Sequence, residues 1–180
     1  MMYVRFGWIR WLLALIFGVV AGSCAAEPLV LEMNFDIKNG LPGLPNEYTK
    51  LLFSDGSNRY VALVRRSGTV AGPGLFAGAT VQDWGLHVVT TKPEVSGKGS
   101  GYLEIATAKS DVVYLRTELR SMMFPEIDGK SDSVFVGTWE VVGAAGRFSG
   151  LEGAGTLQVK SVSEFERQWI LTGNVNRLPR

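Results

Sequence analysis

A glycine-rich stretch near the carboxyl end of the 180-residue chain constrains its fold more than any other feature. Between Gly143 and Gly155, five glycines surround one large apolar side chain, Phe148. Strand-like apolar runs at 134–142 and 156–162 flank this stretch. Glycine inside a strand pattern marks bulges and tight bends at the corners of β-barrels. We therefore expect Phe148 to fill the core while the glycines turn the chain around it.

The remaining sequence predicts an all-β fold. Period-2 alternation dominates it, and no window of helical length carries a convincing 3.6-residue pattern. Strands are predicted at 29–38, 47–53, 59–66, 81–91, 101–107, 111–120, 133–142, 155–163 and 165–173. Turn signals such as Asn39-Gly40 and Ser67-Gly68 separate them. Short strands in this number and at this spacing indicate a sandwich or a barrel.

The glycine-rich stretch has the order Gly-x-x-Gly-Arg-Phe-x-Gly-x-x-Gly-x-Gly, starting at Gly143. It resembles the Gly-Gly-x-Gly-x-Phe-x-Gly-Ala-x-Gly signature of the allene oxide cyclase and dirigent proteins, which form small closed antiparallel β-barrels. Leu151 departs from that signature, because a small residue is usual at its position. The resemblance implies a closed antiparallel barrel of about eight strands at 27–180, with room for side chains or one small ligand. The alternative is a glycine-rich hairpin of another β fold.

The first 26 residues have the layout of a secretory signal peptide. Arg5 and Arg10 precede a mostly apolar, uncharged run at 11–22, and small residues follow it. The run is shorter than the ~20 apolar residues of a membrane span. Simple cleavage fits the small residues, while Ala21-Gly22-Ser23-Cys24 resembles a lipoprotein box that would be lipidated at Cys24. We expect an exported protein, periplasmic or secreted, whose only membrane association is through its signal or a lipid anchor.

Composition argues against several functions. Without the two signal-peptide arginines, 16 basic residues face 17 acidic ones, so no basic field exists to hold nucleic acid. Cys24 is the only cysteine and His87 the only histidine. A zinc site needs three or four such ligands, so we expect no metal. The glycine-rich stretch lacks the Gly-Lys-Ser/Thr ending of a phosphate-binding loop and leads into a strand, so we expect no cofactor.

The first predicted strand holds the clearest candidates for chemistry. Glu32, Asn34 and Asp36 alternate with apolar residues and therefore share one face. If that face meets solvent, they form an ordinary polar surface. If it lines the lumen, Glu32 is a desolvated carboxylate with raised proton affinity. Which face lines the lumen is left open by the sequence.

The family resemblance extends to this strand. Allene oxide cyclases carry an inward-pointing Glu-x-Asn on the first barrel strand and a proline in the following loop, and Glu32, Asn34 and Pro42 match that order and rough spacing. The resemblance implies that Glu32 stabilises positive charge as an epoxide opens. It also implies that Asn34 helps to hold a water near the epoxide oxygen.

Three further side chains are candidates for ligand contacts. His87 is either a structural residue of its strand or a proton donor in a polar lumen. Tyr114 and Arg116 share a strand face, which is either a salt-bridged outer surface or a contact for a ligand carboxylate or phenol. The apolar loops at 41–45 and 122–125 either pack over a barrel end or form a lid on a ligand.

These observations leave three functions open. The barrel could bind an apolar small molecule and catalyse a cofactor-free cyclisation or isomerisation through Glu32 and Asn34. It could instead bind or steer an apolar or phenolic ligand without catalysis, as dirigent proteins do. The third possibility is a structural envelope protein. The resemblance also implies a homodimer or a homotrimer.

Overall fold

The computed structural model describes residues 26–91, 96–108, 110–123 and 133–177. Strands make up most of this part of the chain, and its only helical element is one short turn, η1 (Gly146–Phe148). The strands are β1 (Glu27–Asp36), β2 (Gly40–Leu41), β3 (Leu44–Pro45), β4 (Glu47–Leu52), β5 (Arg59–Ala71), β6 (Thr80–Thr90), β7 (Ser96–Ala108), β8 (Asp111–Met123), β9 (Ser133–Ala144), β10 (Leu151–Ser161) and β11 (Glu166–Arg177). The predicted all-β fold is confirmed.

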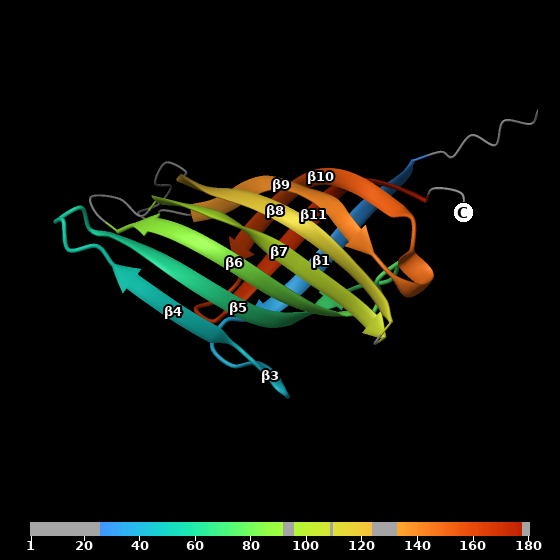
Figure 1. Cartoon of the computed structure of the whole chain (residues 1–180), viewed down its shortest axis with the longest axis horizontal. Coiled ribbons are helices and arrows are strands. Elements are labelled where there is room, and N and C mark those ends of the chain that lie inside the picture. The colour runs from blue at the N-terminus through green and yellow to red at the C-terminus, as the bar shows by residue number, and fades with distance from the viewer. Residues whose placement is uncertain (1–25, 92–95, 109, 124–132, 178–180) are drawn as a thin grey trace, which may run out of the picture.

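Eight of these strands close into a barrel. Their order is β1-β11-β10-β9-β8-β7-β6-β5, and β5 pairs in turn with β1, as Figure 1 shows. All the pairings are antiparallel, so the expected closed antiparallel barrel of about eight strands is confirmed. Closure leaves these strands paired on both sides over most of their length, and the main exception is residues 27–31 of β1, which have no pairing with β5.

The predicted turn at Ser67-Gly68 is wrong, because β5 runs straight through it. Gly68 lies opposite Phe35 of β1, and a Cβ at Gly68 would overlap the Asn34 carbonyl oxygen. The glycine therefore allows β1 and β5 to approach and close the barrel. The first half of β5 pairs with β4 instead, so β4 extends the sheet beside one end of the barrel.

Buried Ser67 fastens the segment between β1 and β4 to β5. Its hydroxyl accepts a hydrogen bond from the Leu41 amide at 2.6 Å and donates one to the Leu44 carbonyl at 2.5 Å. Its own amide donates to Asn46 Oδ1 at 3.0 Å, and Asn46 Nδ2 donates to the Asp36 carbonyl at 2.7 Å. These bonds satisfy backbone groups at the point where β4 replaces β1 alongside β5.

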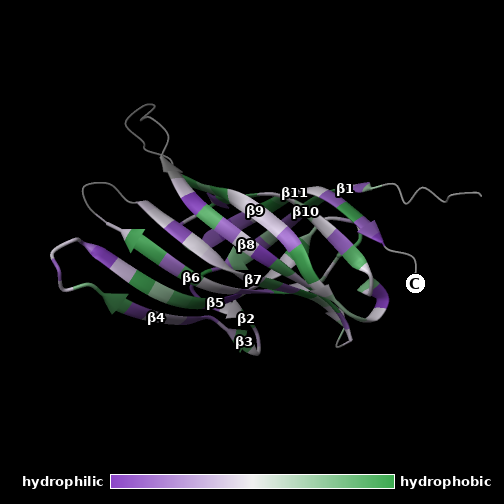
Figure 2. Ribbon diagram, turned by 45° about the horizontal axis from the view of Figure 1, so that its top comes forward, coloured by the Kyte–Doolittle hydropathy of each residue, from purple (hydrophilic) through white to green (hydrophobic). Residues whose placement is uncertain are grey.

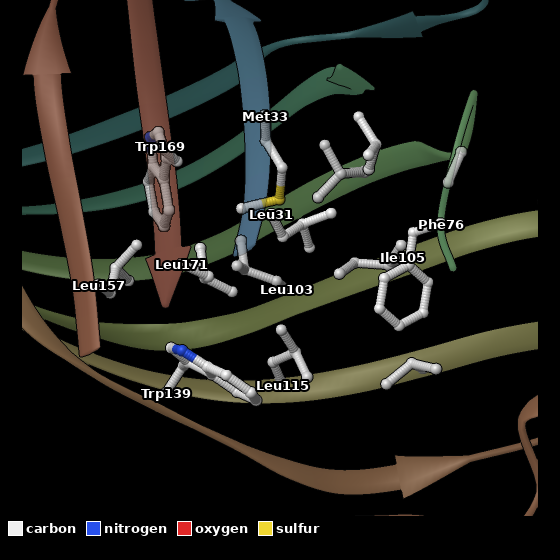
Figure 3. Packing of buried hydrophobic residues seen from close by; sticks show 14 of the residues in the cluster. Leu31, Met33, Phe76, Leu103, Ile105, Leu115, Trp139, Leu157, Trp169 and Leu171 are labelled. Atoms are coloured by element: carbon white, nitrogen blue, oxygen red, sulfur yellow. The ribbon is translucent and has the colours of Figure 1, made fainter. Parts of the chain in front are cut away.

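The apolar faces of the strands point into the barrel. Figure 2 shows hydrophobic and hydrophilic residues alternating along the strands, and Figure 3 shows Leu31 and Met33 of β1 meeting Leu103 and Leu171 from other strands. Trp139 is the largest fully buried side chain. It uses space left by Gly173, where a Cβ would lie 2.8 Å from the indole, and its Nε1 donates to the Thr172 carbonyl at 3.3 Å. Large and small residues thus alternate across the filled interior.

Two phenylalanines from connecting segments close one end of the barrel. Phe76 follows β5 and Phe148 lies in η1, and their ring centroids are 5.1 Å apart. Phe148 is fully buried, which confirms its predicted place in the core. Gly146 and Gly150 turn the chain beside it at φ +63° and +78°. Gly153 and Gly155, by contrast, lie within β10, where they allow close approach to β11.

Candidate ligand-binding site in the open end of the barrel

The other end of the barrel contains a cavity of about 270 Å³, which we call the mouth cavity. Its walls come from the first residues of β5, β7, β9 and β11 and from the last residues of β6, β8 and β10. The apolar wall is formed by Ile37, Ala62, Val64, Val89, Leu119, Phe135, Val159 and Trp169. An apolar wall with a few converging polar groups is typical of a small-molecule site.

His87 is one of those polar groups. It shares the inward face of β6 with Val81, Asp83 and Gly85. Glycines make room for its ring, since a Cβ at Gly85 would lie 2.8 Å from Nε2 and one at Gly99 would lie 3.1 Å from Nδ1. Burial, with a smaller contribution from the Arg66 charge, lowers the pKa of His87 to about 4. The imidazole is therefore neutral at pH 7.

Arg66 lines the same cavity from β5. Its only ion pair among the described residues is a contact of 4.0 Å between Nη1 and Asp83 Oδ2. That separation is longer than a hydrogen bond, so the guanidinium keeps donors for another partner. Arg167, which also lines the cavity, is differently placed, because its Nη1 donates to the carbonyls of Ser163 at 2.8 Å and Glu166 at 2.9 Å.

Asp83 is the buried acid of the site, with an exposed fraction of 2%. Its Oδ2 has no hydrogen-bond partner, and the residue does not line the mouth cavity. Burial raises the pKa of its carboxyl to about 7, although the Arg66 charge acts in the opposite direction. A buried carboxyl with a strongly raised pKa beside a charged partner marks a candidate functional site.

The structure places His87 at the wall of the mouth cavity, and it adds Arg66 and Asp83, which were not among the sequence candidates. The alternation of residues along β5 and β6 contained the information needed to identify Arg66 and Asp83. Arg66 shares a face with Ala62 and Val64, and Asp83 shares one with Val81. A charged residue on an otherwise apolar strand face is a candidate for a lumenal group.

The expectation that Glu32 and Asn34 face the lumen is wrong. Both are exposed on the outer surface of β1, where Glu32 Oε2 accepts a hydrogen bond from Gln168 Nε2 at 3.3 Å. Leu29, Leu31, Met33 and Phe35 take the inward positions of β1 because the lumen here is filled core. Glu32 therefore lacks the desolvation that its proposed charge-stabilising role required.

The other sequence candidates also lie outside the mouth cavity. Pro42 is exposed in the turn between β2 and β3 and does not line the cavity. Tyr114 and Arg116 are exposed on the outer face of β8, and Arg116 forms an ion pair with Glu140. This arrangement is the salt-bridged outer surface that the sequence offered as the alternative. Cys24 and residues 124–132 lie outside the described part of the chain, as do the side chains of Met122 and Met123.

Metal ligation and membrane-spanning helices can be assessed for the residues that the structure describes. No three His, Cys, Asp or Glu side chains among them gather closely enough to hold a metal ion. Within the same residues, no helix has the length and apolar character needed to cross a membrane.

Comparison with known proteins adds no further assignment. No protein-family model, no curated protein and no solved structure matches the chain. The resemblance to the allene oxide cyclase and dirigent proteins thus remains an expectation drawn from the glycine-rich motif and the first strand.

Proposed function

We propose that the protein is an exported β-barrel that binds a small apolar molecule carrying one anionic group in its mouth cavity. The observation that carries the proposal is Arg66, a half-buried guanidinium with free donors at the wall of an apolar cavity. Export is supported by the signal-like layout of the first 26 residues. The expected class of ligand, apolar or phenolic molecules, thereby narrows to apolar molecules with an acidic group.

The lining of the cavity favours this ligand class. Trp169 and Phe135 offer aromatic surface to an apolar body. Lys98 and Lys160 line the cavity together with Arg66 and Arg167, while none of the described residues that line it is acidic. The positive field of these groups attracts an anion, and Arg66 can hold a planar carboxylate with two parallel hydrogen bonds.

The proposal is binding rather than catalysis. Glu32 and Asn34, the residues on which a cyclase mechanism depended, lie on the outer surface. Asp83 is close to the site but does not line the cavity, so a bound molecule would not reach its carboxyl. A catalytic acid or base must lie within hydrogen-bond reach of the atom it serves.

Isothermal titration calorimetry with two matched pairs of probes tests the proposal. Octanoate and indole-3-acetate carry the anionic group, while 1-octanol and indole-3-ethanol keep the apolar body without it. We expect the acids to bind about tenfold more tightly than the alcohols, because a charge-assisted hydrogen bond contributes roughly 1.5 to 3 kcal/mol. Arg66→Gln should abolish this preference, while Arg147→Gln, at the opposite end of the barrel, should preserve it.

A second variant examines the location of the site. Phe135→Trp adds volume to the wall of the cavity and should weaken binding of acids and alcohols alike. Equal affinity of acids and alcohols for the unmodified protein would contradict the role of Arg66. Absence of binding by all four probes would contradict the proposed function as a whole.

A further inference from the structure

A row of charged and aromatic side chains crosses the outer face of the barrel, away from the mouth cavity. In the strand register its members lie directly opposite one another on β4 to β9, in the order Glu47, Arg65, Trp84, Tyr102, Arg116 and Glu140. Side chains at opposed positions of antiparallel strands point to the same side of the sheet. We call these six residues the outer row.

The centre of the outer row is an aromatic platform. Trp84 and Tyr102 face each other across β6 and β7, and their exposed fractions are 46% and 51%. The exposure is unusual because large aromatic side chains on a monomeric sheet normally pack against something. Beneath them, Gly85 pairs with Gly101, and a Cβ at Gly101 would overlap the Trp84 carbonyl oxygen. The two strands therefore approach closely under the platform.

An arginine–glutamate pair flanks the platform on each side. The Arg65 guanidinium lies 5.3 Å from the centre of the Trp84 ring and is 2.5 Å from Glu47 Oε1. Arg116 stands beyond Tyr102 and is paired with Glu140. Each pair presents both hydrogen-bond donors and acceptors but carries no net charge.

The outer face is hollowed at this place. A shallow depression of about 660 Å³ is lined by five of the six residues of the outer row, together with Leu63, Leu86 and Ser100 from neighbouring positions. The depression extends across strands β4 to β8, so it is a groove suited to an extended ligand rather than an enclosed pocket for a compact one.

The charges of the outer row decide between classes of ligand. A nucleic acid or another polyanion would have to displace Glu47 and Glu140 from their arginines, and it would meet no excess positive charge. A neutral chain of sugars can contact both the aromatic platform and the arginine–glutamate pairs. The C–H faces of pyranose rings stack on aromatic rings, and their hydroxyl groups both donate and accept hydrogen bonds.

The same charges disfavour a face-to-face dimer of the chain that is centred on the platform. A two-fold axis in the plane of the sheet, centred between Trp84 and Tyr102, would place like charges together. With the axis along the strands, Glu47 would meet the partner's Glu140 and Arg65 would meet the partner's Arg116. With the axis along the row, each residue would meet its own counterpart. Like charges in direct opposition oppose association.

We infer that the outer row binds a neutral polysaccharide, with Trp84 and Tyr102 stacking on sugar rings and the two arginine–glutamate pairs contacting hydroxyl groups. The site is separate from the mouth cavity, so it stands independently of the proposed small-molecule function. A barrel with both sites would attach itself to a glycan surface and hold a small ligand there.

Titration with cellohexaose and chitohexaose, together with co-sedimentation on cellulose and chitin, tests the inference. We expect at least one of these glycans to bind. Trp84→Ala and Tyr102→Ala should each weaken that binding about tenfold, because each removes a stacking surface. Trp84→Tyr keeps an aromatic ring at this position and should retain most of the glycan binding. Phe165→Ala, which removes an aromatic ring of similar exposure from the β10–β11 turn, should leave it unchanged.

Thermal unfolding and far-ultraviolet circular dichroism of each variant establish that the barrel is intact, since these side chains are surface groups. Absence of binding to every glycan would overturn the inference. Glycan binding that Trp84→Ala does not weaken would overturn it as well. Multi-angle light scattering supplies a third outcome: an oligomer that Trp84→Ala dissociates would identify the outer row as a contact between copies of the chain and refute the glycan site.

Discussion

Arg66 Nη1 lies 4.0 Å from Asp83 Oδ2 inside the barrel, and four residues further along β6 the same interior face carries His87. Burial moves the pKa values of the two β6 side chains in opposite directions, to about 7 for Asp83 and about 4 for His87. Both groups are therefore mainly neutral in the folded protein just below pH 7. The positive charge of Arg66 remains, ready for an external anion.

These opposite shifts determine how stability depends on pH. The folded pKa of Asp83 exceeds its ordinary value of 3.8, so its contribution to stability grows as pH falls through about 7 and is lost as pH rises. The folded pKa of His87 lies below its ordinary value of 6.5, so its contribution is lost as pH falls from 6.5 toward 4. Between pH 6.5 and 4, the folded and unfolded chains each bind one proton at this pair, and the two contributions cancel.

Asp83→Asn should expose the contribution of His87. Between pH 6.5 and 4.5, the free energy of unfolding of the variant should fall relative to that of the unmodified protein by about 1.4 kcal/mol per pH unit. Urea denaturation at pH 4.5, 5.5 and 6.5 measures this slope. Glu152→Gln, at an exposed position on β10, should follow the unmodified profile. Parallel profiles for Asp83→Asn and the unmodified protein would contradict the raised pKa.

His87→Gln should have the opposite effect. With Asp83 alone binding a proton in the folded state, the free energy of unfolding should rise by about 1.4 kcal/mol for each unit that the pH falls between 6.5 and 4.5, relative to the unmodified protein. The double variant Asp83→Asn/His87→Gln should be nearly flat in the same urea series. A His87→Gln profile parallel to that of the unmodified protein would mean that His87 is already charged in the folded barrel, and a flat His87→Gln profile would contradict the raised pKa of Asp83.

Gly155→Ala should destabilise the barrel by about 3 kcal/mol, at the upper end of the range for overpacked cores. A Cβ at Gly155 would overlap the Thr172 carbonyl oxygen, and the two strands would have to move apart. Gly143→Ala is the matched control, because the nearest atom to a Cβ there is Tyr114 Cδ2 at 3.5 Å. Guanidinium denaturation compares the two variants, and equal stability would show that β10 and β11 do not need the close approach.

Phe148→Ala should cost about 3 to 5 kcal/mol of unfolding free energy, because it leaves a cavity in the closed end of the barrel and removes the ring that contacts Phe76. Phe165→Ala removes the same side chain from a position that is 40% exposed and should cost much less. Calorimetric unfolding temperatures test the difference. Similar shifts for both variants would show that η1 is not part of the cooperative core.

Ser67→Ala should cost about 1 to 3 kcal/mol, because it leaves the buried Leu41 amide and Leu44 carbonyl without their partner. Ser100→Ala removes an exposed hydroxyl from β7 and serves as the control. Hydrogen exchange adds a local measurement, in which the Leu41 amide should lose protection in Ser67→Ala. Unchanged protection there would contradict the fastening role of the serine.

The first strand shows what the alternation of polar and apolar residues along the sequence can and cannot predict. It correctly grouped Leu31 with Met33 on one face and Glu32 with Asn34 on the other. It did not determine which face turns inward, and the family resemblance pointed to the wrong one. The choice depends on what the other strands place in the lumen, and here they place a packed apolar core.

The sequence by itself determined most of the barrel strands, the grouping of residues on their faces and the place of Phe148, since period-2 alternation and glycine conformations are properties of a few consecutive residues. Only the tertiary structure decided the site. Arg66 and Trp169 line one cavity because the strands pair in one register and the sheet closes, although β5 and β11 are far apart in the chain. Register and closure depend on the summed packing of all eight strands, which no local pattern contains.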